Sequence, residues 1–438
     1  MIVFQTILLG LVFGLQPVTL MVGPQVKSVE VRLDGTTIGV LTGEPWVTQC
    51  DFGESPHPHE LVAVARDGSG RELGRARQWV NMPRPGAEAT LLLERGPQAN
   101  QVVAARLAWN EVKGTWPKTV RVILDGKALT IRDARRFELP PCDPAQAHVL
   151  SAELVFAEGR TARADAAFGG DIGEETQSEL TAVPLVLEPG KKLPALPEIQ
   201  TWFRDGDASL RVLGVEQGPF DVVLIPDQAV RQVLAKESGA RTGVPFGGRW
   251  RTGSQLLIFD PGHNDNRLFI AFAVPQFFYG SDAYARVVFP TYPPMEFVTS
   301  NFRARLANLD LGLTAIGEQA LADAVATMGA LAAASNRPRT IVLLLAGSRE
   351  DASSITPTGA RAYLQDMHVP LVVWSLLGDG ETDGWGTAED VSSGSRMGRA
   401  AKHLRDQLAQ QRIVWLEGAH LPQRIRLGES VKGVHLAP

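Results

Sequence analysis

A domain-scale duplication in the N-terminal part of the chain constrains its fold more than any other feature. Three pairs of matching segments define the duplication: Lys27–Gly35 with Lys118–Gly126, Cys50-Asp51 with Cys142-Asp143, and Glu60–Val62 with Glu153–Val155. Within each copy, apolar and polar residues alternate in short runs that Asp-Gly turns separate. Such runs are typical of antiparallel strands, and a copy of about 90 residues suits a small β-sandwich. We therefore expect two small β-sandwich domains, at residues 23–95 and 96–168.

The two cysteines, Cys50 and Cys142, hold equivalent places in the two copies. Domains arranged end to end would separate their Cα atoms by far more than the ~7 Å limit for a disulfide, whereas domains side by side could bring them together. We expect two buried thiols, and a disulfide stays the alternative. The segment His59–Ala76 resembles the late hairpin of bacterial immunoglobulin-like modules, while His57 and His59 are expected to lie in a solvated loop.

The first 22 residues carry no charged side chain and are mostly apolar. Gln5, Gln16 and Pro17 interrupt the run, which makes it short for a membrane span of about 20 apolar residues. We interpret residues 1–22 as a signal peptide, with a retained N-terminal anchor as the alternative. The protein is then expected to be exported, that is periplasmic, on the cell surface or secreted. A net charge of -5 without a long basic run argues against nucleic acid as a partner.

Residues 169–197 are interpreted as an extended linker, because an acidic stretch is followed by prolines at 184, 189, 194 and 197. Beyond the linker, short apolar runs typical of buried strands appear: Val222–Ile225, Ile341–Leu345 and Val369–Leu376. Helical patterns alternate with these runs: Gly317–Ala334, Thr358–Met367 and Arg396–Gln411. Alternating strands and helices predict a mainly parallel sheet covered on both faces, so residues 198–438 are predicted to form a doubly wound α/β domain.

This C-terminal half resembles a von Willebrand factor A domain of the divergent type found in exported bacterial proteins, notably acidobacterial ones. The resemblance begins with a short hairpin at Trp202–Gly214 and covers about half of the chain. Its other matching segments are Phe220–Arg231, Gln319–Ala334, Thr340–Ser353, Val369–Gly378 and Trp385–Gln411. The resemblance implies a doubly wound α/β fold with an adhesion site at the carboxyl ends of its strands.

In that family the adhesion site holds Mg²⁺ through an Asp-x-Ser-x-Ser loop, a Thr from a second loop and an Asp from a third. Asp227 matches the first Asp, but Ala229 and Arg231 stand where the two Ser would be. Gln319 takes the Thr position, and Ala346 takes that of the last Asp. Because Mg²⁺ requires a set of oxygen ligands, we expect a degenerate site that holds no metal and no cofactor.

We expect a non-catalytic scaffold that binds a protein partner through this metal-free domain, presented on the tandem immunoglobulin-like modules. Ligands of open α/β sheets lie at the carboxyl ends of the strands. The binding face is therefore predicted to contain six residues: Asp227, Arg231, Thr314, Gln319, Ser348 and Arg349. An enzyme is not expected, because the chain lacks the Gly-x-Ser-x-Gly and His-Glu-x-x-His patterns.

Two alternatives stay open. The first is a metal-dependent adhesion module with a rearranged site, in which Thr314 and Asp227 would be joined by borrowed carboxylates from Glu350 or Asp351. The second is a hydrolase built around His263 and Asp265, in a loop that is otherwise interpreted as a tight turn.

Overall fold

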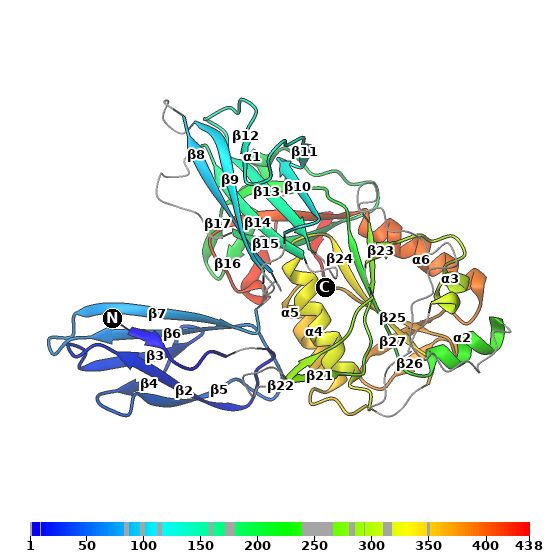
Figure 1. Cartoon of the computed structure of the whole chain (residues 1–438), viewed down its shortest axis with the longest axis horizontal. Helices are drawn as coiled ribbons and strands as arrows, with labels where there is room; N and C mark the ends of the chain where they lie inside the picture. The colour runs from blue at the N-terminus through cyan, green and yellow to red at the C-terminus, as the bar shows by residue number, and fades with distance from the viewer. Residues whose placement is uncertain are drawn as a thin grey trace.

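The computed structural model describes residues 2–8, 10–82, 87–96, 101–111, 116–156, 161–170, 180–238, 266–279, 285–292, 294–309, 318–347 and 351–438. Most of the regular structure in these ranges is β-sheet. Two β-sandwiches come first, and a C-terminal part that carries the longer helices follows (Figure 1). Among the described residues, no helix combines the length and the apolar character needed to cross a membrane.

Seven strands form the first sandwich: β1 (Ile2–Phe4), β2 (Leu15–Val22), β3 (Ser28–Leu33), β4 (Thr36–Leu41), β5 (Val47–Asp51), β6 (His59–Arg66) and β7 (Glu72–Val80). They pair in two antiparallel sheets, in the orders β1-β2-β5 and β4-β3-β6-β7. Val18 and Leu20 of β2 are buried in the core between these sheets. The boundary predicted at residue 23 is therefore wrong, because residues 2–22 contribute two strands. Export stays a prediction.

Seven strands also form the second sandwich: β8 (Ala87–Arg95), β9 (Val102–Glu111), β10 (Thr119–Leu124), β11 (Lys127–Leu129), β12 (Arg136–Glu138), β13 (His148–Val155) and β14 (Thr161–Phe168). Their sheet orders, β8-β9-β12 and β11-β10-β13-β14, repeat those of the first sandwich strand for strand. The prediction of two immunoglobulin-like β-domains is confirmed. The boundary between them lies between Val80 and Ala87 rather than at residue 96, because β8 pairs with β9.

An Asp–His pair repeats in the two sandwiches and corrects the alignment of the copies. Asp34 and Asp125 each follow the third strand of their sandwich in the left-handed region, with φ of 52° and 50°. Asp34 bonds His59 Nδ1 at 2.7 Å, and Asp125 bonds His148 Nδ1 at 2.8 Å. His59 is therefore equivalent to His148, and the match drawn between 60–62 and 153–155 is four residues out of register. His59 also packs against the ring of Phe52, so it does not lie in a solvated loop.

Both cysteines are free thiols. Cys50 is fully buried in the core of the first sandwich, and burial raises the pKa of its thiol to about 11. Cys142 is only partly buried and donates to the carbonyl of Pro140. The expectation of a buried thiol is thus confirmed for Cys50 and wrong for Cys142.

The C-terminal part begins with an antiparallel layer of two sheets, β18-β28-β15-β30 and β17-β16-β29. Its elements come from both ends of this part: β15 (Leu180–Leu187), α1 (Leu196–Ile199), β16 (Phe203–Asp205), β17 (Ala208–Leu210), β18 (Val212–Glu216), β28 (Gln411–Glu417), a 3-10 turn (Pro422–Arg424), β29 (Ile425–Leu427) and β30 (Val434–Leu436). The hairpin predicted at 202–214 is confirmed as β16–β17.

The linker predicted at 169–197 is wrong for its described portion, because β15 is an interior strand of this layer. Val183 and Leu185 are buried in its core. The carbonyl of Pro184 accepts from the backbone of Ala437 on the β30 side, so the proline nitrogen faces that side, and β28 loses no ladder bond. The density of prolines concealed an ordinary buried strand.

A seven-stranded sheet forms the centre of the C-terminal part, in the order β23-β20-β19-β24-β25-β27-β26. The interior pairs β20–β19–β24–β25–β27 are parallel, and the edge strands β23 and β26 are antiparallel. Its strands are β19 (Asp221–Pro226), β20 (Arg267–Ile270), β23 (Met295–Glu296), β24 (Arg339–Leu345), β25 (Leu371–Ser375), β26 (Gly380–Thr382) and β27 (Gly386–Asp390). The three buried runs predicted from the sequence are β19, β24 and β25.

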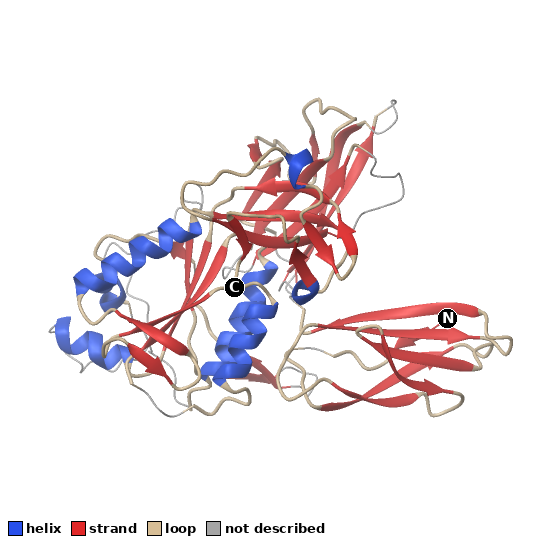
Figure 2. Ribbon diagram, turned by 180° about the vertical axis from the view of Figure 1, so that it is seen from behind, coloured by secondary structure: helices blue, strands red, loops and turns tan. Residues whose placement is uncertain are grey.

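Helices lie on both faces of the seven-stranded sheet, as Figure 2 shows from behind. Its connections include α2 (Val230–Ser238), α3 (Phe302–Asn308), α4 (Leu321–Ala334), α5 (Pro357–Asp366), α6 (Gly394–Leu408) and the hairpin β21 (Gln276–Tyr279)–β22 (Ala285–Val288). Helices α4 and α5 share one apolar core, and α2, α3 and α6 share the other. Helices α4, α5 and α6 match the three helical patterns found in the sequence.

Buried charges join the second sandwich to the C-terminal part. Arg163 of β14 bonds Asp165 at 2.8 Å, Glu153 at 3.1 Å and Glu216 of β18 at 2.9 Å, and it stacks over Trp415 at 4.9 Å. Burial disfavours the Arg163 cation, but the three carboxylates together raise its pKa. A small apolar cluster lies beside the arginine: Val149, Ala167, Leu213, Ile413 and Trp415. The second sandwich is therefore fixed against the antiparallel layer.

The same network continues into the seven-stranded sheet. Asp221 of β19 bonds Arg267 at 2.7 Å and Arg337 at 3.2 Å. Burial alone would raise the pKa of Asp221, but the two guanidinium groups outweigh it and hold the pKa below its usual value. Arg337 also lies 3.7 Å from Glu153 of the second sandwich. The sandwich, the antiparallel layer and the central sheet thus share one group of charges.

The first sandwich docks on α5 and the 3-10 turn. Three side chains from it, Leu11, Phe13 and Met82, pack against the core beneath α4 and α5. Three hydrogen bonds cross the same interface: His57 Nδ1 with Asp366 Oδ2 at 2.5 Å, Tyr363 Oη to the Asn81 carbonyl at 2.7 Å, and Gln423 Nε2 to the Pro58 carbonyl at 2.7 Å. Figures 1 and 2 both show this sandwich beside the helix layer of α4 and α5.

Candidate functional site

The candidate site lies at the carboxyl ends of the central strands β19 and β24. Counted along the chain, the first parallel strand, β19, lies between the second, β20, and the third, β24. The connections after β19 and β24 therefore leave in opposite directions, which is where open α/β sheets form a crevice. Asp227 directly follows β19, and Ala346 directly follows β24. The two predicted positions are thus neighbours in space.

Asp227 is only 3% exposed, and its carboxylate accepts three backbone N–H groups. Oδ1 accepts from Ala229 at 2.9 Å and from Val230 at 3.0 Å, so Asp227 caps the start of α2. Oδ2 accepts from Ala346 at 2.7 Å, across the gap between the two strand ends. A carboxylate that is bonded in this way stabilises both loops, and its oxygens point at peptide nitrogens.

Gln319 connects the second predicted loop to the first. The side chain is 3% exposed, and its Oε1 accepts from the backbone of Gln228 at 2.8 Å. Its carbonyl accepts from Ala352 at 2.7 Å, in the loop that follows β24. The start of α4 is then capped from that loop, because Asp351 Oδ1 accepts from Leu321 at 2.7 Å. All three loops that the sequence predicted to converge do converge.

The remaining predicted residues divide into two groups. Arg231 lies exposed on the first turn of α2, close to Asp227 in the chain. Thr314, Ser348 and Arg349 lie outside the described residues. The same holds for residues named in the two alternatives: His263, Asp265 and Glu350.

The residues that the structure describes at this site do not fit the Mg²⁺ that the resemblance implies. Mg²⁺ needs oxygen ligands in an octahedral array. Here the N–H of Ala346 occupies the side of Asp227 that faces β24, and Ala229 offers no oxygen from its side chain. Within the described parts of the chain, no three His, Cys, Asp or Glu side chains gather closely enough to hold a metal ion. The arrangement suits a helix cap and a loop crosslink.

A second constellation, which sequence reasoning missed, lies at the interface of the first sandwich with α5. Ser55 Oγ lies 3.2 Å from His57 Nε2, and His57 Nδ1 lies 2.5 Å from Asp366 Oδ2. This is the order of hydroxyl, imidazole and carboxylate that activates a serine nucleophile. No local signal could have revealed it, since Asp366 is 309 residues from His57.

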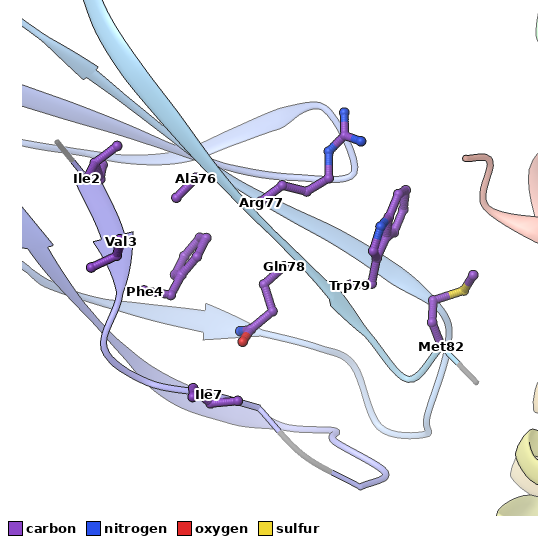
Figure 3. Close-up of a pocket in the computed structure, with 9 residues that line it drawn as sticks. All are labelled: Ile2, Val3, Phe4, Ile7, Ala76, Arg77, Gln78, Trp79 and Met82. Carbon is purple, nitrogen blue, oxygen red and sulfur yellow. The ribbon is translucent and has the colours of Figure 1, made fainter. Parts of the chain in front are cut away.

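An open groove of about 720 Å³ lies on the first sandwich between β1 and β7 (Figure 3). Residues of the N-terminal strand form one wall and residues of β7 the other: Ile2, Val3, Phe4 and Ile7 face Ala76, Arg77, Gln78 and Trp79, with Met82 at one end. Arg77 stacks over Trp79 at 5.4 Å and forms an ion pair with Glu60 at 2.8 Å. The wall from residues 2–7 is thus apolar, whereas the β7 wall carries Arg77 and Gln78, and the charge of Arg77 is compensated by Glu60.

No family model matches this chain, and no curated protein matches it. Among solved structures, it is similar to the fibronectin(III)-like modules of Clostridium thermocellum CbhA, with 17% identity over 18% of this chain and 93% of that chain, at a TM-score of 0.17. The central fibronectin-III array of RIM-binding protein matches at 10% identity over 45% of this chain and 80% of that one, with a TM-score of 0.19. Parabacteroides merdae β-glucuronidase matches at 13% identity over 38% and 24%, also with a TM-score of 0.19. At these scores the likenesses carry no argument, and the sandwich fold rests on the strand pairing alone.

Proposed function

We propose that the chain is an exported, non-catalytic binding protein whose C-terminal part is a doubly wound von Willebrand factor A-like domain without a metal. The parallel strands follow the order β20-β19-β24-β25-β27, which is the order 2-1-3-4-5 of one class of doubly wound sheets. Helices on both faces and the convergence of the three loops support the same interpretation.

One observation carries the proposal: the Asp227 carboxylate is bonded to three backbone N–H groups. The aspartate that matches the family's metal ligand instead caps α2 and links two loops. Around it, the exposed side chains of Gln228 and Arg231 mark the face that a partner would meet. Because three domains are fixed to one another by buried contacts, this face has a constant position relative to the sandwiches. A rigid, multidomain protein with such a face suits a scaffold that binds another protein.

The experiment is capture of partners from a native envelope fraction, with the whole chain as bait. Wild type is compared with Arg231→Glu, and with Arg399→Glu on the exposed face of α6 as the matched control. We expect the same partner in Mg²⁺ and in EDTA. Arg231→Glu should lower recovery roughly tenfold, because it reverses the charge of this face, and Arg399→Glu should leave recovery unchanged. Capture that disappears in EDTA would instead support the metal-dependent alternative.

A second candidate function, hydrolysis of an ester, is favoured by the Ser55–His57–Asp366 geometry. Ser55 Oγ would attack the ester carbonyl while its proton passes to His57 Nε2, which returns the proton to the departing alcohol as the ester C–O bond breaks. Water, deprotonated by the same imidazole, would then cleave the acyl-serine and release the acid, while Asp366 orients the imidazole. The same three residues also have a purely structural interpretation, since His57 and Asp366 hold the first sandwich on α5.

A fluorophosphonate probe separates the two interpretations, because it labels only an activated serine. If the constellation is structural, we expect no labelling of Ser55, no hydrolysis of p-nitrophenyl acetate above that of Ser55→Ala, and a loss of stability in His57→Ala of about 1–2 kcal/mol from the lost charge-assisted bond. Covalent labelling that Ser55→Ala and His57→Ala both abolish would establish the hydrolase.

A further inference from the structure

Two tryptophans and an arginine form an exposed cluster on the second sandwich. Trp109 comes from β9, Arg135 directly precedes β12, and Trp116 lies between β9 and β10. The two indoles meet edge to face, with centroids 5.1 Å apart and an angle of 72° between their planes. The Arg135 guanidinium lies 5.2 Å from the centroid of Trp109 and 4.5 Å from that of Trp116. Trp116 is 63% exposed, which is unusual for so large an apolar side chain.

Two hydrogen bonds hold the backbone of Arg135 in place. Its N–H donates to Asp133 Oδ1 at 2.8 Å, and its carbonyl accepts from Leu107 of β9 at 3.0 Å. The next residue, Arg136, is already in register with Arg106 in the β9–β12 pair. The guanidinium is therefore presented from a fixed strand end and not from a free loop.

Arg135 differs from the neighbouring arginines in its charge balance. Glu94 accepts from Arg106 at 2.5 Å and from Arg136 at 2.7 Å, so both of these guanidinium groups are already bonded to a carboxylate. Among the described residues, Arg135 forms no ion pair, and its side chain contacts the two indoles. Stacking leaves the in-plane N–H donors of a guanidinium available, and these donors fit a carboxylate in a bidentate manner.

We propose that Trp109, Trp116 and Arg135 form a binding site for a uronic acid residue of an acidic polysaccharide. The C–H face of a pyranose ring packs on an exposed indole, whose π face is negative, and the ring's carboxylate then meets the guanidinium. A polyphosphate such as single-stranded nucleic acid would need a basic groove along its backbone. Here Arg135, which forms no ion pair among the described residues, stands beside two arginines that are already bonded to Glu94, so a single carboxylate fits better.

The first sandwich supplies a matched control within the same chain. Arg77 stacks over Trp79 at 5.4 Å, in an arrangement like that of Arg135 and Trp116, but Glu60 pairs with Arg77 at 2.8 Å. An anionic ligand would have to displace that carboxylate. Trp79 is also stacked and partly exposed, but we do not expect it to bind a uronic acid residue.

The test is affinity electrophoresis of the full chain in gels that contain polygalacturonate, confirmed by calorimetry with trigalacturonate. We expect retardation of wild type and of Trp79→Ala, and a rise in Kd of roughly tenfold or more in Trp116→Ala and Arg135→Gln, since each removes one of the two contacts. Arg135→Lys should retain part of the affinity, because a point charge replaces the bidentate fork. All four variants alter exposed or partly exposed side chains, and circular dichroism checks that their folds are kept.

Several outcomes would overturn the proposal. Wild type that migrates unretarded has no such site, and equal retardation of Trp116→Ala places any binding elsewhere. Fully methyl-esterified polygalacturonate that retards the chain as strongly as the free acid removes the role of Arg135. Stronger retardation by poly-glutamate or by a single-stranded oligonucleotide identifies a different class of polyanion.

Discussion

Replacing Arg163 with methionine is expected to lower the free energy of unfolding by about 3–5 kcal/mol, because the change leaves buried carboxylates without their cation. Glu153, Asp165 and Glu216 each bond Arg163 directly, and their side chains are 15%, 9% and 8% exposed. Methionine fills a similar volume, so the loss reflects charge more than packing. The effect should concentrate at the contact between the second sandwich and the C-terminal part.

The control is Arg136→Met, because Arg136 bonds Glu94 at 2.7 Å but both groups lie at the surface. An exposed pair of this kind contributes at most about 1 kcal/mol. Urea unfolding of wild type and both variants measures the difference, and calorimetry shows whether the second sandwich then melts separately from the C-terminal part. An Arg163→Met chain as stable as Arg136→Met would show that the network contributes no net stability.

The deficit of Arg163→Met should also depend on pH. Burial would raise the pKa of Glu153, but Arg337 and Arg163 outweigh burial and lower it. A lowered pKa gives stability that is present above the unfolded value of about 4.3 and is lost as pH falls through the folded value. Without Arg163 this contribution is smaller, so the difference between wild type and variant is expected to be largest near pH 7 and to shrink toward pH 4.

The network also shows where sequence reasoning ends. In β14 the residues Thr-Ala-Arg-Ala-Asp-Ala alternate in polarity, which is typical of a strand with one face in water. That polar face instead lies beneath β18 and the end of the central sheet, where Arg163 bonds Glu216 and Asp165 accepts from Asn336 Nδ2. The partners are 53 or more residues away in the chain, and no periodicity encodes such a distance.

The central sheet was predictable because a strand buried on both faces is a continuous run of apolar residues in the sequence. Strand β19 is buried at every position, and its apolar run was visible in the sequence. The place of the site at the end of that strand was also predictable, because the carboxyl ends of parallel strands share one edge of the sheet. What the sequence could not show is the state of Asp227, because its third hydrogen bond comes from a backbone N–H 119 residues away. A backbone donor leaves no mark on residue identity.

Replacing Asp227 with alanine is expected to cost about 3 kcal/mol, because the caps of α2 and the link between two loops are lost together. The N–H groups of Ala229, Val230 and Ala346 would then lack their acceptor in a site that is almost closed to water. Asp227→Asn should recover part of the loss. Its single carbonyl oxygen can still cap α2, whereas its amide N–H₂ would face the donor of Ala346.

The matched control for Asp227→Ala is Ser393→Ala, which removes an exposed cap at the start of α6, where Ser393 Oγ accepts from Arg396 at 3.3 Å. A simple cap of this kind is worth about 1 kcal/mol. Urea unfolding gives the two losses, and hydrogen exchange should show Ala346 exchanging faster in Asp227→Ala but not in Ser393→Ala. The order of the two costs also tests the metal question. Metal-ligating side chains repel one another when the metal is absent, so in EDTA a chain that lacks one of them would be more stable than wild type. An Asp227→Ala chain that is more stable than wild type in EDTA would therefore contradict the structural role assigned to this carboxylate.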